Sequence, residues 1–100
     1  MLTTKKLLSH LNNITYNTNI KIFHENKIYN NFTVLYENNC FVISTKNPKK
    51  TYTVFELKEI LNSINKDLVI VFSFPGESTQ LPDNIDLLVI PYLNSHLILV

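Results

Sequence analysis

The stretch TVFELKEILNSINKDLVIV, residues 53–71, combines a helix start, an amphipathic helix and an apolar strand. Thr53 and Glu56 have the spacing of a capping box, in which each side chain accepts a hydrogen bond from the other residue's backbone N–H. The pattern predicts a helix from Thr53 to about Asn65, followed by a central strand over residues 68–72 that is covered on both faces. Apolar residues at helical spacing form the predicted buried stripe: Leu57, Leu61 and Ile64.

The same pattern occurs fifty residues earlier in the chain. Because the match keeps the helical stripe in register, we interpret the chain as two copies of one unit, residues 1–46 and 51–100. The first helix is predicted to begin at Thr3 or Thr4 with a weaker cap, because Lys6 stands where the second copy has its capping glutamate. The aligned residues are Thr3, Leu7, Leu11 and Ile14 with Thr53, Leu57, Leu61 and Ile64.

Strand patterns follow each predicted helix. Asn19–His24 alternates apolar and polar side chains as a half-buried strand does, and a hairpin is predicted at the end of each copy. The predicted fold class is α+β, with two tandem helix-plus-antiparallel-strands repeats that share one core in a pseudo-two-fold arrangement. A single domain over residues 1–100 is expected, because a unit of about fifty residues is marginal alone. The predicted hairpins pair residues 32–36 with 40–45 across 37–39, and residues 85–92 with 97–100 across 93–95.

The composition indicates an AT-rich genome and a cytoplasmic protein. The chain has no Ala and no Arg, whereas Asn and Leu occur fourteen times each, as codon bias in such a genome predicts. Cys40 is the single cysteine, so an internal disulfide is excluded and a reducing compartment is expected. No stretch has the eighteen or so consecutive apolar residues that a membrane span needs, so no membrane association is predicted.

The motif Thr-Val-x-Glu-Leu at residues 53–57, continued by a polar turn ending in Asp67 and an apolar strand, resembles the opening of short phage-encoded proteins of unassigned role. The first copy is similar to a diverged form of the same unit, so the resemblance covers nearly the whole chain. It implies a fold unit and a phage or mobile-element setting, and it brings no catalytic residues. The partner class that it implies is a host or defence protein, met in the host cell cytoplasm.

A long irregular stretch, residues 73–84, contains the only glycine, Gly76, next to Pro75, and predicts a turn followed by a loop. The resulting hypothesis is a non-enzymatic protein-binding module, an inhibitor of a host or defence complex of the CRISPR type, which uses an acidic surface on the second copy. An insertion without a binding role is the alternative for this loop. The predicted partner-binding residues are Glu77, Asp83 and Asp86.

A basic cluster in the linker between the copies supports an alternative function, that of a small nucleic-acid-associated protein. Lysine ammonium groups contact phosphates, and a neighbouring aromatic ring stacks on a base. The net charge of +1 and the absence of Arg weaken this interpretation. The predicted nucleic-acid-binding residues are Lys46, Lys49, Lys50 and Tyr52.

No catalytic residue, metal site or cofactor is predicted. The soft metal ligands of the chain form no close pair of the kind that zinc sites use, and a single glycine excludes a glycine-rich phosphate loop. The apolar end, residues 97–100, must be covered by its own fold or pair with another chain, so a homodimer through this strand is a further expectation. The soft ligands are His10, His24, His96 and Cys40.

Overall fold

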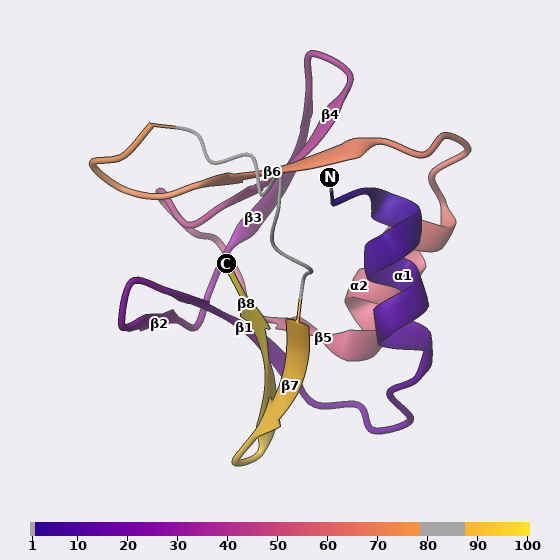
Figure 1. The fold of residues 1–100 in the computed structure, drawn as a ribbon, viewed down its shortest axis with the longest axis vertical. Helices are drawn as coiled ribbons and strands as arrows, with labels where there is room; N and C mark the ends of the chain where they lie inside the picture. Colours follow the sequence, from indigo (N-terminus) through magenta and orange to yellow (C-terminus); the bar gives the residue numbers. More distant parts are fainter. Residues whose placement is uncertain (1, 79–87) are drawn as a thin grey trace.

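Within residues 2–78 and 88–100, which this computed structural model describes, the chain forms two helices and two mixed β-sheets, an α+β fold. The helices lie side by side on one side of the molecule, and the strands fill the other side (Figure 1). The elements are α1 (Thr4–Asn12), β1 (Asn19–His24), β2 (Lys27–Tyr29), β3 (Thr33–Glu37), β4 (Cys40–Ser44), β5 (Tyr52–Thr53), α2 (Val54–Asn62), β6 (Val69–Ser73), β7 (Leu88–Tyr92) and β8 (Ser95–Leu99).

The capping box predicted at Thr53 is confirmed, and it starts α2. The backbone N–H of Glu56 donates to Thr53 Oγ1 at 3.1 Å, and the N–H of Thr53 donates to Glu56 Oε1 at 3.0 Å. The helix ends at Asn62, earlier than predicted, because Ser63 caps it. The Ser63 backbone N–H donates to carbonyls of the last turn, and its hydroxyl donates to the carbonyl of Ile60 at 2.6 Å.

The cap of α1 comes partly from the other half of the chain. Thr3 Oγ1 accepts from the backbone N–H of Lys6 at 3.4 Å, a longer contact than its equivalent in α2. Asp67, just before β6, supplies a carboxylate: its Oδ1 accepts from the N–H of Lys5 at 3.0 Å and from the Thr4 hydroxyl at 3.4 Å. The hydrogen bond from the Lys5 N–H lowers the pKa of Asp67. A helix of the first half therefore begins on a side chain of the second half.

Each sheet contains strands from both halves of the chain. In the five-stranded sheet, β1 pairs in parallel with β8, and β7 pairs with the far edge of β8, while β2 and β5 pair with the other edge of β1. In the three-stranded sheet, the order is β3-β4-β6, and β4 pairs in parallel with β6. The last strand of each half therefore lies beside the strand that follows the helix of the other half, and neither half has a sheet of its own.

The central position predicted for residues 68–72 is wrong, and β8, for which coverage by the protein's own fold was one of two alternatives, takes a central place. β6 is apolar and covered, with Ile70 and Phe72 fully buried, but it lies at the end of its sheet rather than at the centre. Its outer edge contacts the residues before α1, where the N–H of Ile70 donates to the Leu2 carbonyl at 3.0 Å. β8 occupies a central position instead, between β1 and β7, and Ile98 is fully buried.

The expected homodimer through the C-terminal strand therefore loses its basis. A strand pairs with a second chain only through a free edge, and both edges of β8 are paired within this chain. Leu97 and Ile98 are buried, so the apolar end is covered by the protein's own fold.

Both predicted hairpins form, with turns shorter than expected. Each turn has two residues, 38–39 in one hairpin and 93–94 in the other. β7 begins at Leu88, and the earlier part of the predicted strand lies outside the described residues. β2 and β5 have no counterpart among the predicted strands, because three and two residues are too few to show alternation. The pairs that close the two turns are Glu37 with Cys40 and Tyr92 with Ser95.

One core joins the two helices to both sheets. The predicted helix stripes are buried at their leucines, whereas Ile14 and Ile64, which follow the helices, are only partly covered. Neither helix, at nine residues each within the described part of the chain, is long and apolar enough to cross a membrane. The buried core includes Leu7, Leu11, Leu57, Leu61, Ile20, Ile22, Ile43, Ile70, Ile98, Phe32, Phe41 and Phe72.

Removing the cap hydroxyl of α2 is expected to destabilise the protein more than removing that of α1. Thr53→Ala leaves the N–H of Glu56 without its acceptor and lowers the free energy of unfolding by about 1 kcal/mol. Thr3→Ala removes the longer contact to Lys6 and the Thr3 hydroxyl's contact with Asp67 but keeps the bond from the Lys5 N–H to Asp67, so a smaller loss is expected. Urea unfolding at pH 7 measures both losses, and equal values would contradict the shared cap of α1.

The Asp67 contact predicts a pH dependence of stability. Because the pKa of Asp67 is lowered in the folded protein, its carboxylate contributes stability above the pKa of an unfolded aspartate, about 3.9, and loses it as the pH falls through the folded value. Asp67→Asn is expected to be less stable than the wild type at pH 7 and to approach it near about pH 3. Urea unfolding across this range measures the difference, which a pH-independent result would contradict.

Candidate functional site

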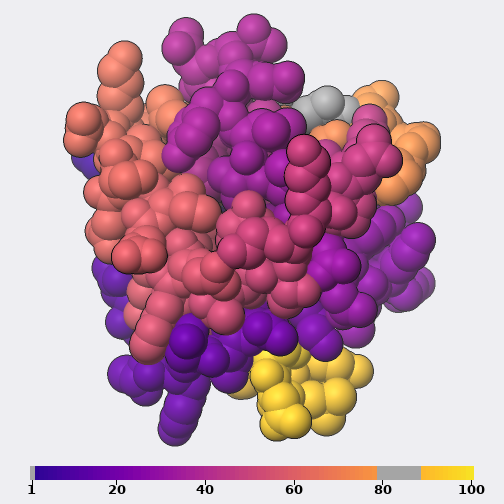
Figure 2. All heavy atoms as spheres, turned by 180° about the vertical axis from the view of Figure 1, so that it is seen from behind, coloured from indigo at the N-terminus to yellow at the C-terminus, as the bar shows by residue number. Residues whose placement is uncertain are grey.

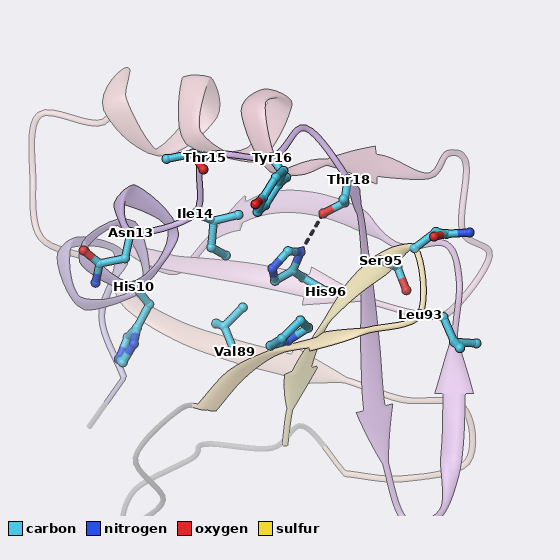
Figure 3. Close-up of a pocket in the computed structure, with 12 residues that line it drawn as sticks. His10, Asn13, Ile14, Thr15, Tyr16, Thr18, Val89, Leu93, Ser95 and His96 are labelled. Carbon is cyan, nitrogen blue, oxygen red and sulfur yellow. Dashed lines mark hydrogen bonds between the residues drawn. The ribbon is translucent and has the colours of Figure 1, made fainter.

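A cavity of about 650 Å³ opens between the segment that follows α1 and the β7–β8 hairpin (Figure 3). One wall comes from residues 10–18 and the other from residues 89–96, so each half of the chain provides one wall. We call this cavity, together with its rim, the groove. Its lining residues are His10, Asn13, Ile14, Thr15, Tyr16, Thr18, Val89, Pro91, Leu93, Asn94, Ser95 and His96.

The pairing of β1 with β8 positions the polar base of the groove. It sets Ile20 beside His96, and Thr18, just before β1, reaches the imidazole ring, with its Oγ1 2.6 Å from His96 Nδ1. His96 is 8% exposed, and its ring lies between the two walls (Figure 3). Among the described residues the ring has no other hydrogen bond, so Nε2 remains available to an occupant of the groove.

Two exposed apolar side chains line the groove. Tyr16 is 72% exposed on one wall, and Leu93 is 88% exposed at the tip of the hairpin. The hairpin projects from the molecule beside the segment that follows α1 (Figure 2). Apolar surface gathered next to a cavity is typical of an interaction site rather than of an ordinary protein surface.

Leu93 is held in an unfavourable conformation at the tip of this hairpin. Its φ of 52° lies in the left-handed region, which costs a residue with a side chain about 1 kcal/mol. The first turn position of the β3–β4 hairpin is Asn38, with a φ of 50°, and asparagine tolerates this conformation better. Because Leu93 is exposed, neither packing nor turn preference explains a leucine here. Backbone strain of this kind is concentrated at functional positions.

Within residues 2–78 and 88–100, the lining of the groove contains no acidic, lysine or arginine side chain. None of its twelve residues is Lys, Arg, Asp or Glu, and its hydrogen-bonding groups belong to His, Asn, Ser, Thr and Tyr. Such a lining suits a neutral occupant that is mainly apolar and forms a few hydrogen bonds. It offers no lysine or arginine to a phosphate group.

Pro91 restricts the outer edge of the same hairpin. It pairs with His96 in β7, next to the pair that closes the turn. At that position of an antiparallel hairpin the backbone nitrogen points away from the partner strand, and proline has no N–H there. β7 lies at the end of its sheet, so its outer edge lacks a hydrogen-bond donor near the groove.

Of the three predicted partner-binding acids, Glu77 lies within the described residues, and Asp83 and Asp86 lie outside them. The turn predicted around Gly76 forms, and Gly76 has a φ of 75°. The Glu77 side chain is 26% exposed, and its Oε1 lies 2.9 Å from His24 Nε2. This carboxylate is therefore held by a histidine of the first half of the chain.

The predicted basic cluster is used partly in internal contacts. Lys50 pairs with Glu56, which raises the pKa of the Lys50 ammonium and lowers that of the Glu56 carboxyl. The ammonium also lies 4.8 Å from the centre of the Tyr52 ring, which stacks on Phe32 at 4.7 Å. Two of the four predicted residues thus take part in the protein's own packing. The remaining two, both exposed, are Lys46 and Lys49.

His24 is a buried residue whose contacts the sequence did not reveal. Its ring stacks on Phe74 with centroids 3.9 Å apart, and its Nδ1 lies 3.2 Å from the Val100 carbonyl oxygen. Burial lowers the pKa of the imidazole, but the hydrogen bonds with Glu77 and then Val100 outweigh it and raise the pKa overall. These two partners lie 53 and 76 residues away in the chain, so no local motif marks them.

Comparison with protein-family models, with curated proteins and with solved structures found no match to this chain. The size of the groove, its lining and its exposed apolar rim are therefore the features that bear on function.

Proposed function

We propose that this chain is a non-enzymatic protein-binding module, and that its partner protein places an apolar segment in the groove. The observation that carries the proposal is Leu93, an 88% exposed leucine held at positive φ on the rim of a cavity. An exposed apolar side chain in a strained conformation gains stability only when another surface covers it. A partner with an apolar pocket for Leu93 would provide that cover.

The extent of the apolar rim favours a protein over a small molecule. A cavity of about 650 Å³ has the size that holds one small ligand or a few side chains. A small ligand inside it would leave the outer parts of Tyr16 and Leu93 in water, whereas a protein segment lying across the rim covers both. Tyr16 also belongs to a residue type that is frequent at the centre of protein interfaces.

The pair of Thr18 and His96 supports binding better than catalysis. Its distance of 2.6 Å is that of a nucleophile and its base. A catalytic imidazole also needs a third group, usually a carboxylate, that orients its other nitrogen. No Asp or Glu of the described residues lines the groove. The contact instead fixes the His96 ring, so that Nε2 is placed to form one hydrogen bond with the partner.

Nucleic-acid binding has less support than protein binding. The groove offers no lysine or arginine to a phosphate, and Lys50 and Tyr52 already contact Glu56 and Phe32. The two other lysines of the linker, in a chain without arginine, form a small electrostatic footprint. The basic linker therefore stays an alternative prediction.

The proposal extends to a phage or mobile-element origin, with a host or defence protein, such as a CRISPR-type complex, as the inhibited partner. The AT-rich composition and the Thr-Val-x-Glu-Leu motif at residues 53–57 support this origin. The acidic surface stays a second candidate for contact with the same partner. Its residues are Glu77, Asp83 and Asp86.

We also propose that the chain arose by internal duplication. Support comes from the threonine caps of the two helices and from the reciprocal pairing of β1 with β8 and of β6 with β4. Under this proposal the turn of residues 38–39 is the counterpart of the turn of residues 93–94. The first turn position is then Asn38 in the first copy and Leu93 in the second. A substitution at Asn38 is therefore a matched control for one at Leu93.

Leu93→Asn is expected to remove partner binding and to stabilise the isolated protein. Asparagine relieves the strain at positive φ, so the free energy of unfolding rises by up to about 1 kcal/mol, while the rim loses its apolar tip. Asn38→Leu is the matched control, because it places leucine at the same position of the other hairpin and leaves the groove unchanged. Affinity capture from a low-GC bacterial host, read by mass spectrometry, and urea unfolding measure the two effects.

The proposal requires a captured protein that survives nuclease treatment, is retained by Asn38→Leu and is lost with Leu93→Asn and with Tyr16→Ser. Failure of the wild type to capture such a protein, or capture of it by all four chains, would overturn the groove as the binding site. Capture that nuclease abolishes, and that Lys46→Glu with Lys49→Glu weakens, would favour the nucleic-acid alternative.

Charge reversal at the three acids tests the second candidate surface. If the acidic surface binds the partner, the triple variant loses the protein that the wild type captures. Undiminished capture by the triple variant would remove this surface from the proposal. The substitutions are Glu77→Lys, Asp83→Lys and Asp86→Lys.

A further inference from the structure

A second group of polar side chains lies at the opposite end of the β1–β8 pair from the groove. His24 ends β1, Glu25 takes the first position of the turn to β2, and Glu77 follows the Gly76 turn. Their ligand atoms lie within 4.8 Å of one another, the one such group of metal-ligating side chains within residues 2–78 and 88–100. His24 Nε2 lies 2.9 Å from Glu77 Oε1 and 3.9 Å from Glu25 Oε1.

The hydrogen bonds of the His24 ring require a cation between Nε2 and Glu77. A carbonyl oxygen only accepts, so the contact with Val100 places a hydrogen on Nδ1. In the neutral ring Nε2 then carries a lone pair that faces the Glu77 carboxylate, a second acceptor. The other neutral tautomer satisfies Glu77 but sets a lone pair against the Val100 carbonyl. A second proton or a metal ion on Nε2 resolves this conflict.

Glu25 favours the metal ion over the proton. One proton on Nε2 compensates one carboxylate, but two carboxylates converge on this nitrogen. The Glu25 side chain is 73% exposed and could extend into water, yet its carboxylate lies toward His24 Nε2. Its φ of 49° is also a conformation that asparagine, as at Asn38, tolerates better than glutamate. A glutamate held at this turn position beside a buried imidazole fits a divalent cation.

We propose that His24 Nε2, Glu25 and Glu77 bind a zinc ion, with water as the fourth ligand. Zinc takes imidazole nitrogen and carboxylate oxygen at about 2.0–2.2 Å, and many zinc sites combine three protein ligands with one water. Magnesium and calcium prefer oxygen ligands alone, so the imidazole favours a transition metal such as zinc over either of them. The Nδ1–H bond to the Val100 carbonyl is the outer contact that typically orients a metal-binding histidine.

The fold fixes the imidazole ring and leaves the carboxylates adjustable. His24 is 8% exposed and stacks on Phe74, so packing sets its orientation. The ligand atoms of a tetrahedral zinc site lie about 3.3–3.5 Å apart. The present distances, 2.9 Å and 3.9 Å to His24 Nε2 and up to 4.8 Å within the group, require the exposed Glu25 and the partly exposed Glu77 side chains to rotate toward the ion. The bound ion would fasten the Gly76 turn to the end of β1.

Zinc titration of the whole chain, first stripped of metal with a chelator, tests the proposal. ZnCl₂ should bind at one site per chain and raise the melting temperature of the wild type, whereas MgCl₂ should not. Glu25→Gln is the decisive variant, because its exposed side chain lies outside the core. It should unfold like the wild type without metal, and its zinc affinity should fall about tenfold or more.

Glu37→Gln is the matched control, because Glu37 is an exposed glutamate beside the turn of the β3–β4 hairpin. It should bind zinc as the wild type does. A wild type whose melting temperature does not respond to zinc, or a Glu25→Gln variant with wild-type affinity, would overturn the site and leave a protonated His24 paired with Glu77. The groove and this cluster share no residue, so the result is independent of protein capture.

Discussion

The parallel pairing of β1 with β8 is the interaction on which the rest of the molecule depends. It brings Ile22 beside Ile98 and places the last strand inside the larger sheet. The groove lies at one end of this pair and the His24 cluster at the other. Because β4 and β6 make the reciprocal contact, the two halves are connected twice and must fold together. Such non-local pairs form later than local hairpins, since a long loop must close first.

Local features of the fold were predictable because their causes are local. The capping box of Thr53 and Glu56, the strand Asn19–His24 and the two hairpins each depend on residues a few positions apart. The strand order was not predictable, because an apolar run shows that a strand is buried but not which strands lie beside it. β6 was expected at the centre of its sheet and lies at the end of it. The contact of Asp67 with the start of α1 spans 62 residues, beyond any local pattern.

The candidate site was less predictable than the fold, because charges are visible in a sequence and their pairing is not. Glu77 and Lys50 stand out as charged residues, yet the structure places each beside a polar partner, His24 and Glu56. The groove is built from side chains that no motif marks. The one sequence feature that indicates the groove is Leu93, a leucine in a turn that favours asparagine or glycine. This feature is recognisable only when the turn is known to have two residues.

Pro91 also bears on how the protein behaves at high concentration. A projecting apolar hairpin whose outer strand has no neighbour among the described residues is the kind of surface on which identical chains stack into fibrils. Because β7 ends its sheet and Pro91 removes a donor from that edge, an incoming strand cannot continue the hydrogen-bond ladder past this residue. Pro91 therefore disfavours the stacking of a second copy on this edge, while the apolar side chains of the hairpin stay exposed for a different partner.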